Sequence, residues 1–416
     1  MRPKANLDLA RLVVVGASLA GLRAVEAARK AGFGGKVTLI GAEPHLPYDR
    51  PPLSKGFLDV ARDGVGFADP TFRTEQALTN ELGVELLLGK KATGLDTAKS
   101  VVSVGDRHVP YDALVIATGV EARTLSGVDE LAGVHTLRTL DDAIAVRAAL
   151  DGGARTVVIG AGFIGSEVAS SAKKRGLDVT MVEALPTPLV RAVGEVMGSA
   201  CASLHRRNGT DLRCGVGVTA IEGFGKVERV VLSDGTELSA DLVVVGIGAA
   251  PATGWLEGSG LKLDNGIMCD ETLATGVDGV YAAGDIARWY NPHFERHMRL
   301  EHWTSAAEQG ALTARNALDP PSARAYPTVP YFWSDWYDSR IQFVGIPHAD
   351  EVTVVAGDLD TDGTLVALYR SGDLLTGALT INGQTMIMKY RNLIAKRASW
   401  AGALAFAESH RPTART

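Results

Sequence analysis

The chain has 416 residues, of which 46% are hydrophobic and 22% are charged, and 47 of them are glycine. This length and composition predict two or three globular domains with substantial cores. The formal net charge of −6 and the pI near 5.9 provide no chain-wide basic field, which argues against nucleic acid or an anionic membrane surface as the partner.

The N-terminal segment admits two interpretations. Basic residues precede "RLVVVGASLAGL" at positions 11–22, a pattern that superficially resembles a secretory signal. We favour the alternative, because the same residues are needed for the nucleotide-binding unit described next. No run of about 18 uninterrupted apolar residues occurs in the sequence, so a membrane-spanning helix is not expected.

Residues 11–43 predict the strand, glycine turn, helix and strand of a βαβ dinucleotide-binding unit. Gly16 permits the sharp turn and Gly21 permits close packing of the helix, while Ser18 departs from the glycine expected at the middle position. Backbone amides at the helix start are expected to hold a pyrophosphate. Glu43, at the end of the second strand, is expected to accept hydrogen bonds from an adenosine ribose; the alternative is a surface acid in a loop. The expected binding turn comprises Gly16, Ser18, Leu19, Ala20 and Gly21.

Residues 156–183 predict a second βαβ unit, and here the G-x-G-x-x-G fingerprint is complete. Glu183 ends its second strand, and its negative charge favours a free ribose hydroxyl over a 2′-phosphate. The next basic residue is Arg191, so NADH is expected rather than NADPH. A glycine fingerprint alone could be a structural turn, but two such units in one chain make that alternative improbable. The expected NADH turn comprises Gly160, Gly162, Phe163, Ile164 and Gly165.

Two further apolar segments run into turns of small residues, "ALVIATGVEAR" at 113–123 and "GVYAAGDIA" at 279–287. Both turns are expected at strand ends, where open α/β sheets bind ligands. Asp285 is placed to accept hydrogen bonds from a ribityl chain, and Gly284 would allow its close approach. The alternative for Asp285 is a helix N-cap without a ligand.

The order of GASLAG, YDRPPLSK, ATGVEAR, GAGFIGSE, YAAGD, EHWTSAAEQG and PYFWSD resembles the glutathione-reductase-type, FAD-dependent ferredoxin reductases that serve bacterial oxygenases. The resemblance covers nearly the whole chain. It implies an α/β fold with two Rossmann-like dinucleotide-binding domains and a C-terminal α/β domain that contains an antiparallel sheet. The implied domains are 1–117 with 247–327 for FAD, 118–246 for NADH, and 328–416 for the C-terminal reductase domain.

The chain has no cysteine before Cys201; the other two are Cys214 and Cys269. Their spacing matches neither a zinc ribbon nor a CxxC pair, no metal-ligand cluster is visible, and a reducing cytoplasm is the simplest setting. Related flavoprotein disulfide reductases pass electrons from flavin to a cysteine pair near the early helix. That relay is excluded here, because exchange requires a thiolate. The resemblance therefore implies that electrons enter FAD as hydride from NADH and leave singly to an external redox protein.

The same resemblance implies roles for individual residues. Lys55 corresponds to a lysine that approaches flavin N5, and Glu167 to the acid that meets this lysine and the nicotinamide. Arg50 and Arg123 correspond to residues that contact FAD. The alternatives are an ordinary salt bridge for Lys55 and Glu167 and a hinge for Arg123. The remaining FAD-contacting positions implied by the segment after the strand at 113–116 are Ala117, Thr118 and Gly119.

Two tryptophan motifs lie in the last third of the chain. A helix is expected to start near Thr304, and the family places its N-terminus and the preceding Glu301, His302 and Trp303 toward the flavin. Trp303 would flank the flavin ring and Trp333 would lie near its edge, with ordinary core packing as the alternative. Trp336 departs from the family, whose members often have glutamine there.

The implied partner is a [2Fe–2S] ferredoxin that serves a Rieske oxygenase or a cytochrome P450. Because such ferredoxins are usually acidic, a local basic rim is expected. The alternatives are an NADH oxidase, a monodehydroascorbate-reductase-like enzyme and an apoptosis-inducing-factor-like NADH sensor; the sequence leaves monomer and homodimer open. Candidates for the rim are Arg296, His297, Arg299, Lys389, Arg391 and Lys396.

The C-terminal residues 351–383 alternate apolar runs with DG and NG turn signals, which predicts an antiparallel sheet. A helical end is expected over residues 383–399.

Overall fold

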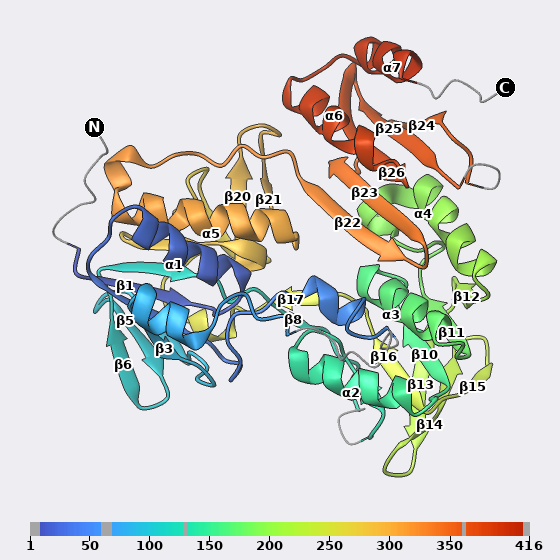
Figure 1. Cartoon of the computed structure of the whole chain (residues 1–416), viewed down its shortest axis with the longest axis horizontal. Helices are drawn as coiled ribbons and strands as arrows, with labels where there is room; N and C mark the ends of the chain where they lie inside the picture. The colour runs from blue at the N-terminus through green and yellow to red at the C-terminus, as the bar shows by residue number, and fades with distance from the viewer. Residues whose placement is uncertain (1–8, 60–68, 128–130, 360–362, 411–416) are drawn as a thin grey trace. The chain divides into compact units, whose positions relative to one another are not determined.

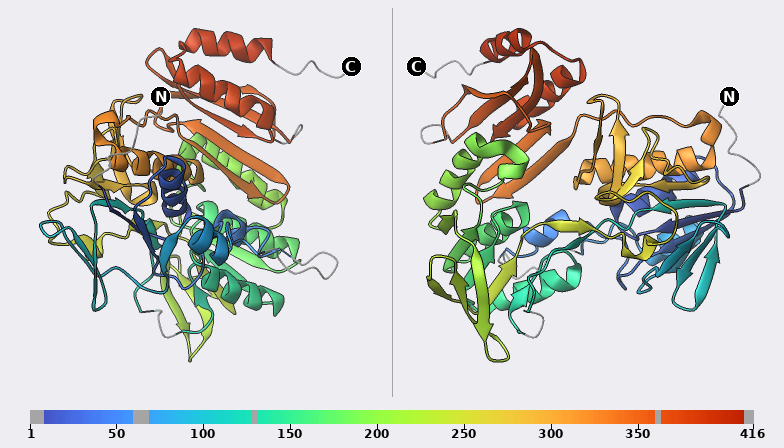
Figure 2. Two further views of the ribbon diagram at one scale, coloured as in Figure 1. Left: turned by 60° about the vertical axis from the view of Figure 1, so that its left-hand side comes forward. Right: turned by 180° about the vertical axis from the view of Figure 1, so that it is seen from behind.

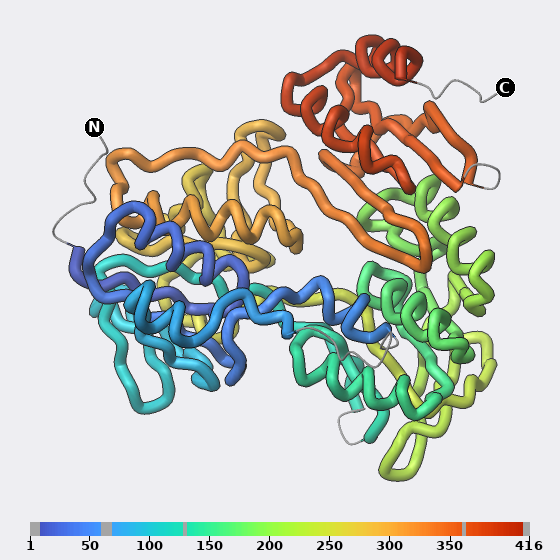
Figure 3. The backbone as a smooth tube through the Cα atoms, viewed as in Figure 1, coloured from blue at the N-terminus to red at the C-terminus, as the bar shows by residue number. Residues whose placement is uncertain are grey.

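The structure, a computed structural model, describes residues 9–59, 69–127, 131–359 and 363–410. The expected domain limits at residues 1 and 416 therefore lie outside the described residues. The chain divides into two compact units, and the tube in Figure 3 traces the backbone from the N-terminus to the C-terminus. The first unit comprises Met1–Asp49, Asp69–Glu121 and Ala250–Thr328, and the second comprises Arg50–Ala68, Ala122–Ala249 and Val329–Thr416.

A parallel sheet forms the centre of the first unit, with the strand order β19-β7-β1-β2-β3 (Figure 1). The βαβ unit predicted for residues 11–43 is confirmed, since β1 pairs in parallel with both β2 and β7 and is followed by α1. Residues 11–15, which are apolar after Arg11, are thus the middle strand of this sheet. The elements are β1 (Arg11–Val15), α1 (Leu19–Lys30), β2 (Lys36–Ile40), β3 (Val84–Leu87), β7 (Ala113–Ile116) and β19 (Val280–Ala282).

Helices α1 and α5 pack side by side in the first unit (Figure 1). Helix α5 spans Trp303–Leu318, so the helix predicted to start near Thr304 is confirmed. A Cβ at Gly310 would lie 2.1 Å from the carbonyl oxygen of Ala20, so only glycine permits this approach of the two helices. Two small three-stranded sheets complete the unit, formed by β4 (Gly94–Asp96), β5 (Val101–Val104) and β6 (Arg107–Pro110), and by β18 (Ile267–Cys269), β20 (Ala287–Asn291) and β21 (Arg296–Met298).

The second unit contains a second parallel sheet, with the order β12-β11-β10-β16-β9. The βαβ unit predicted for residues 156–183 is confirmed by the parallel pairing of β10 with β11 around α3. All four residues of β10 and of β16 are buried, as expected for almost entirely apolar strands of a parallel sheet. The elements are β9 (Val134–His135), α2 (Leu140–Asp151), β10 (Thr156–Ile159), α3 (Phe163–Lys174), β11 (Val179–Glu183), α4 (Val190–Arg207), β12 (Asp211–Cys214) and β16 (Leu242–Val245).

The C-terminal part of the second unit is an antiparallel sheet with the order β22-β23-β26-β25-β24, which confirms the predicted sheet. Helices α6 and α7 follow it, as Figure 2 shows, and α6 confirms the predicted helical end. The elements are β22 (Tyr331–Trp336), β23 (Ser339–Gly345), β24 (Glu351–Ala356), β25 (Leu365–Ser371), β26 (Leu374–Ile381), α6 (Gln384–Ala395) and α7 (Trp400–Ser409). A separate hairpin sheet consists of β13 (Val218–Gly223), β14 (Val227–Leu232) and β15 (Glu237–Ser239).

The turn signals were only partly informative about the C-terminal sheet. The NG pair, Asn382 and Gly383, connects β26 to α6 instead of closing a hairpin. Tyr337, with φ of 54°, lies in the tight turn between β22 and β23, where glycine or asparagine would be the usual choice. The DG pair includes residue 362, which lies outside the described residues.

The predicted α/β fold class is confirmed. The division into three domains stays a prediction, because the second compact unit holds both the expected NADH segment and the C-terminal segment. Within the described part of the chain, no helix combines the length and the apolar character needed to cross a bilayer.

Candidate functional site

The glycine turn after β1 has the geometry that close approach of a ligand requires. Gly16 has φ of 118°, and a Cβ there would lie 2.1 Å from the carbonyl oxygen of Ala117. A Cβ at Gly21 would lie 1.9 Å from the carbonyl oxygen of Gly16. Ser18 is the N-cap residue of α1, and its side chain does not cap the helix. The amides of Leu19 and Ala20 therefore belong to a helix N-terminus of the kind that binds phosphate groups.

Turns from three neighbouring parallel strands meet at this edge of the first sheet. The Ala117 amide donates to the carbonyl oxygen of Val15 at 2.7 Å. Gly284 follows β19 with φ of 76°, and a Cβ there would lie 3.2 Å from the Cβ of Ala20. Parallel strands present their carboxyl ends together, which is why residues from three distant motifs converge. The turn residues brought to this edge are Gly16, Ser18, Ala117, Thr118, Gly119, Gly284 and Asp285.

Gln309 is a residue of this edge that the sequence reasoning missed. Its side chain is 1% exposed, and its Oε1 accepts a hydrogen bond from the Gly284 amide at 2.8 Å. Asp285 lies in a single 3-10 turn, η5 (Gly284–Ile286), so it does not start a long helix. Gln309 thus fixes the turn that presents Asp285. The available signal was a glutamine in the second turn of a helix whose residues there are mostly small.

Trp303 is the first residue of α5, and His302 is its N-cap. The indole Nε1 of Trp303 donates to Asp49 Oδ1 at 2.8 Å, which ties the start of this helix to the segment that precedes the proline pair. Burial lowers the pKa of His302 to about 4, so this imidazole is neutral near pH 7. Glu301 pairs with Arg299 at 2.9 Å.

The other residues expected to contact FAD have partners within the protein. Glu43 accepts a hydrogen bond from the Tyr48 hydroxyl at 2.5 Å. In the second unit, Arg50 Nη1 donates to the carbonyl oxygen of Arg138 at 2.7 Å, and Arg123 Nε donates to the carbonyl oxygen of Ala249 at 3.3 Å. Arg123 is exposed.

The second glycine turn repeats the geometry of the first. Gly160 has φ of 97°, and a Cβ at Gly165 would lie 2.1 Å from the Gly160 carbonyl oxygen. Gly162 is the N-cap of α3, followed by Phe163 and the partly exposed Ile164. Glu183 ends β11 and accepts the amides of Ala161 at 2.8 Å and Leu185 at 2.9 Å. The acid predicted to bind a ribose therefore also orders the glycine turn itself.

Lys55 and Glu167, predicted to form a pair, do so in the second unit. Lys55 Nζ lies 2.8 Å from Glu167 Oε1, with side-chain exposures of 20% and 3% respectively. The pair is held by 3-10 helix η1 (Pro51–Ser54), which packs against α3. Burial of an ion pair is tolerated only where further hydrogen bonds satisfy the charges.

Two serines supply those hydrogen bonds, and the sequence reasoning missed both. Ser54 Oγ donates to Glu167 Oε2 at 2.5 Å, and the Ser334 hydroxyl donates to Glu167 Oε1. Both serines are buried. The signal for Ser334 was the alternation in β22, which places Ser334 and Trp336 on one face of the strand and Trp333 on the other.

The two tryptophans of β22 have different surroundings. Trp336 is fully buried and stacks on His205, with ring centroids 4.7 Å apart. Trp333 is half-buried; its ring lies 5.9 Å from that of Tyr331, and the Arg340 guanidinium lies over it. The departure from glutamine at position 336 thus lies in the core of the second unit.

The described cysteines are free and unsuited to thiol exchange. Cys201 is fully buried, and burial raises its pKa to about 12. Burial also raises the pKa of Cys214 and Cys269 above the ordinary value. A thiol with a raised pKa contributes little nucleophilic thiolate near neutral pH. Among the residues that the structure describes, no group of three or more His, Cys, Asp or Glu could hold a metal ion.

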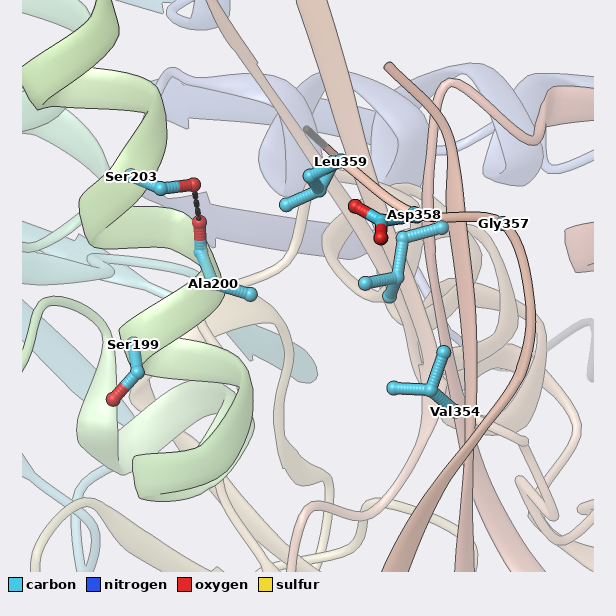
Figure 4. Close-up of a pocket in the computed structure, with 8 residues that line it drawn as sticks. Ser199, Ala200, Ser203, Val354, Gly357, Asp358 and Leu359 are labelled. Atoms are coloured by element: carbon cyan, nitrogen blue, oxygen red, sulfur yellow. Dashed lines mark hydrogen bonds between the residues drawn. The ribbon is translucent and has the colours of Figure 1, made fainter. Parts of the chain in front are cut away.

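A depression elsewhere in the second unit contains none of the predicted site residues (Figure 4). Side chains of α4 line one side of it, and residues of and next to β24 line the other; Asp358 is the only charged residue among those that line it. The lining residues are Ser199, Ala200, Ser203, Val354, Gly357, Asp358, Leu359 and Leu365.

Both glycine turns fit a dinucleotide. In each, glycines lack the Cβ that would clash where two backbone segments come close, and each turn leads directly into the N-terminus of a helix. The first also has Asp285 and Glu43 at the same sheet edge, which are acceptors suited to the hydroxyls of FAD. The second has Glu183, which suits NADH. Lys55 and Glu167 form, within the second unit, the charged pair that the family resemblance led us to expect.

Comparison with known proteins gives a family for almost the whole chain. The pattern of the family described as pyridine nucleotide-disulphide oxidoreductase matches residues 10–310, and that described as reductase C-terminal matches residues 331–411.

Individual relatives match over similar lengths. Rhodocoxin reductase of Rhodococcus erythropolis is 35% identical over 92% of this chain and 89% of its own. The anthranilate 1,2-dioxygenase system ferredoxin–NAD(+) reductase component of Burkholderia cepacia is 36% identical over 92% and 93%. In the solved covalent putidaredoxin reductase–putidaredoxin complex, the matching chain superimposes with a TM-score of 0.87 at 32% identity, covering 94% of each chain.

Proposed function

This chain belongs to the pyridine nucleotide-disulphide oxidoreductase family, and on that premise we propose that it takes hydride from NADH onto FAD and passes single electrons to a [2Fe–2S] ferredoxin. The ferredoxin would in turn supply a Rieske oxygenase or a cytochrome P450. Family membership confirms the predicted cofactors, FAD and NAD(H), and the predicted class of oxidoreductase.

The observation that carries the proposal is the buried pair of Lys55 and Glu167. By the family resemblance, residues 51–55 fill the segment in which related disulfide reductases have their cysteines. FAD, when bound, accepts electrons as a hydride pair and releases them one at a time. The chain's own residues hold a fixed positive charge at Lys55 and anchor it with a buried carboxylate. The three described cysteines, whose pKa values are raised by burial, do not offer a competing thiol route.

We propose individual roles on the same basis. The turn residues at the edge of the first sheet, with Glu43, Arg50, Arg123, Glu301, His302 and Trp303, would bind FAD. The second glycine turn and Glu183 would bind NADH. Trp303 and Trp333 would border the flavin. Residues 1–117 with 247–327, 118–246 and 328–416 would then act as FAD, NADH and reductase C-terminal domains.

The basic rim remains part of the proposal. Lys389 and Lys396 are exposed on and just after α6, and Arg296 and His297 are exposed on β21. Arg391 donates to the Val329 carbonyl oxygen at 2.9 Å and Arg299 pairs with Glu301, so these two also have structural roles. An acidic ferredoxin would be attracted to the exposed charges. We place the protein in the cytoplasm, in keeping with its free cysteines.

Stopped-flow spectroscopy of the purified yellow protein tests the proposal. The flavin is reduced anaerobically with NADH and, separately, with NADPH, and the reduced protein is mixed with an acidic [2Fe–2S] ferredoxin. We expect strong preference for NADH and reoxidation by ferredoxin that is much faster than by air. Rapid reoxidation by oxygen or a small quinone, with no response to a panel of ferredoxins, would instead favour an NADH oxidase. A long-lived charge-transfer complex with NADH-induced dimerisation would favour an NADH sensor.

A further inference from the structure

Three donors converge on the carboxylate of Glu167. Lys55 Nζ lies 2.8 Å from Oε1, Ser54 Oγ lies 2.5 Å from Oε2, and the Ser334 hydroxyl also reaches Oε1. An ionised carboxylate only accepts hydrogen bonds, so each serine must direct its single hydroxyl hydrogen at Glu167. The position of this carboxylate therefore depends on what orients the two serines.

Trp336 orients Ser334. Its indole Nε1 lies 2.8 Å from Ser334 Oγ. The indole N–H is a donor only, so the Ser334 oxygen must accept this hydrogen bond. The hydroxyl hydrogen of Ser334 is then left for Glu167. A residue that can only donate thus fixes the direction of the whole chain of hydrogen bonds.

His205 in turn holds Trp336. The two rings are inclined by 30° with centroids 4.7 Å apart, and both side chains are fully buried. Both imidazole nitrogens have partners: Nδ1 lies 2.7 Å from the Tyr337 hydroxyl, and Nε2 lies 3.1 Å from Ser166 Oγ. Because both nitrogens are held, the imidazole ring has a fixed orientation against the indole.

Hydrogen bonds also anchor Tyr337, which lies in the turn after β22. The Tyr337 hydroxyl also lies 2.7 Å from Thr210 Oγ1, and the Tyr337 amide donates to Ser170 Oγ at 2.5 Å. These contacts hold Tyr337 at a positive φ of 54°, a conformation that non-glycine residues adopt at a cost. Strand β22 is thereby fixed against α3, the helix that carries Glu167.

We propose that Trp336 is a positioning residue for hydride transfer: it directs the Ser334 hydroxyl onto Glu167 and so keeps this carboxylate against Lys55. This inference rests on the proposed function, in which Lys55 and Glu167 serve the reaction with NADH. It has a second consequence. Because the indole nitrogen accepts no hydrogen bond, no proton can pass along this chain beyond Ser334.

A double-mutant cycle tests the proposal. Trp336→Phe and Ser334→Ala should each lower the limiting rate of flavin reduction by NADH about fivefold, which is the effect of losing one net hydrogen bond. The NADH concentration that gives half of the limiting rate should change little. The double variant should be no slower than the slower single variant, because both changes remove the same constraint. Tyr369→Phe is the matched control: it removes a buried donor to the Val193 carbonyl oxygen in the same unit, and its rate should stay near wild type. The proposal would be overturned if the rate loss in the double variant equalled the product of the two single losses. It would also be overturned if the variants changed only the NADH concentration needed for half of the limiting rate.

A spectroscopic measurement adds a readout that does not depend on turnover. Among the six tryptophans, the indole N–H signal of Trp336 in a ¹⁵N-labelled sample is identified by its loss in Trp336→Phe. It should move in Ser334→Ala and in Glu167→Gln and stay in place in Tyr369→Phe. An unmoved signal in Ser334→Ala, together with fast reduction of the wild type by NADH, overturns the inference alone. Failure of NADH to reduce the wild-type flavin overturns the proposed function and the inference with it.

Discussion

The ammonium of Lys55 lies 2.8 Å from a carboxylate oxygen of Glu167, and the Glu167 side chain is only 3% exposed. This ion pair joins the segment after the proline pair to the second turn of α3. Buried pairs add little to stability over an apolar alternative, so their retention requires another reason. In the proposed reaction that reason is a fixed positive charge for the flavin.

Lys55→Met is expected to slow flavin reduction by NADH by about tenfold or more, equivalent to at least about 1.4 kcal/mol of barrier, while FAD retention changes less. Anaerobic stopped-flow measures the rate, and flavin content after gel filtration measures retention. Lys174→Met is the matched control, since Lys174 forms a more exposed pair with Asp59 at 3.6 Å in the same unit. Equal reduction rates in Lys55→Met and wild type would remove Lys55 from the mechanism.

Glu183→Gln should narrow the preference for NADH over NADPH on the order of tenfold, because the negative charge that opposes a 2′-phosphate is lost. The glutamine also has one carbonyl oxygen for the two amides that Glu183 now accepts, from Ala161 and Leu185. The ratio of half-saturation concentrations for the two dinucleotides measures the change. Asp211→Asn, at the start of the neighbouring strand β12, removes an exposed charge and should leave the ratio unaltered. The assignment of Glu183 fails if the two variants behave alike.

Gly310→Ala should weaken FAD retention, because the added Cβ would lie 2.1 Å from the Ala20 carbonyl oxygen and push α1 away from α5. Overpacking of this kind costs about 1–3 kcal/mol, or roughly a tenfold loss of affinity if the strain falls on the binding turn. Flavin occupancy after dialysis is the measurement. Gly34→Ala is the control, since nothing lies within 4 Å of a Cβ at that position. Full occupancy in Gly310→Ala would show that the turn tolerates the displacement.

Buried His205 should make the free energy of unfolding decrease as the pH is lowered. Burial lowers its pKa to about 3 in the folded state, while the unfolded residue titrates near 6.5. The unfolded state therefore binds the proton first, and stability is lost as pH falls from about 6.5 toward 3. When the pH falls from 7.5 to 5, protonation of this one histidine in the unfolded state lowers the free energy of unfolding by about 2 kcal/mol. Urea titrations of wild type and His205→Gln should show a flatter pH dependence for the variant over that window.

Other groups titrate in the same direction and remain in both proteins, among them His302 with its pKa of about 4. The comparison of variant with wild type removes their contribution. A His205→Gln slope equal to that of wild type would mean that the folded protein takes up a proton at His205 without penalty.

Local sequence patterns determined the two nucleotide-binding units, the helix that begins at Trp303 and the C-terminal sheet. Each depends on interactions between near neighbours: apolar runs make buried strands, and glycines free a tight turn. The NG pair at Asn382 was misleading in detail because a turn signal does not state whether a strand or a helix follows. The family motif indicated the pair of Lys55 and Glu167, and the structure brings the two together.

The tertiary structure alone decided how that pair is supported. Ser54, Ser334, Trp336 and His205 come from a 3-10 turn, a strand and a helix that are distant in sequence. The alternation in β22 places Ser334 on the buried face of the strand, but it does not state which groups Ser334 contacts. That is decided only when β22 packs against α3 and the indole N–H of Trp336 donates to the Ser334 hydroxyl oxygen. Composition and spacing thus determine which elements form. The direction of a hydrogen bond in the core depends on which donors and acceptors packing brings within reach.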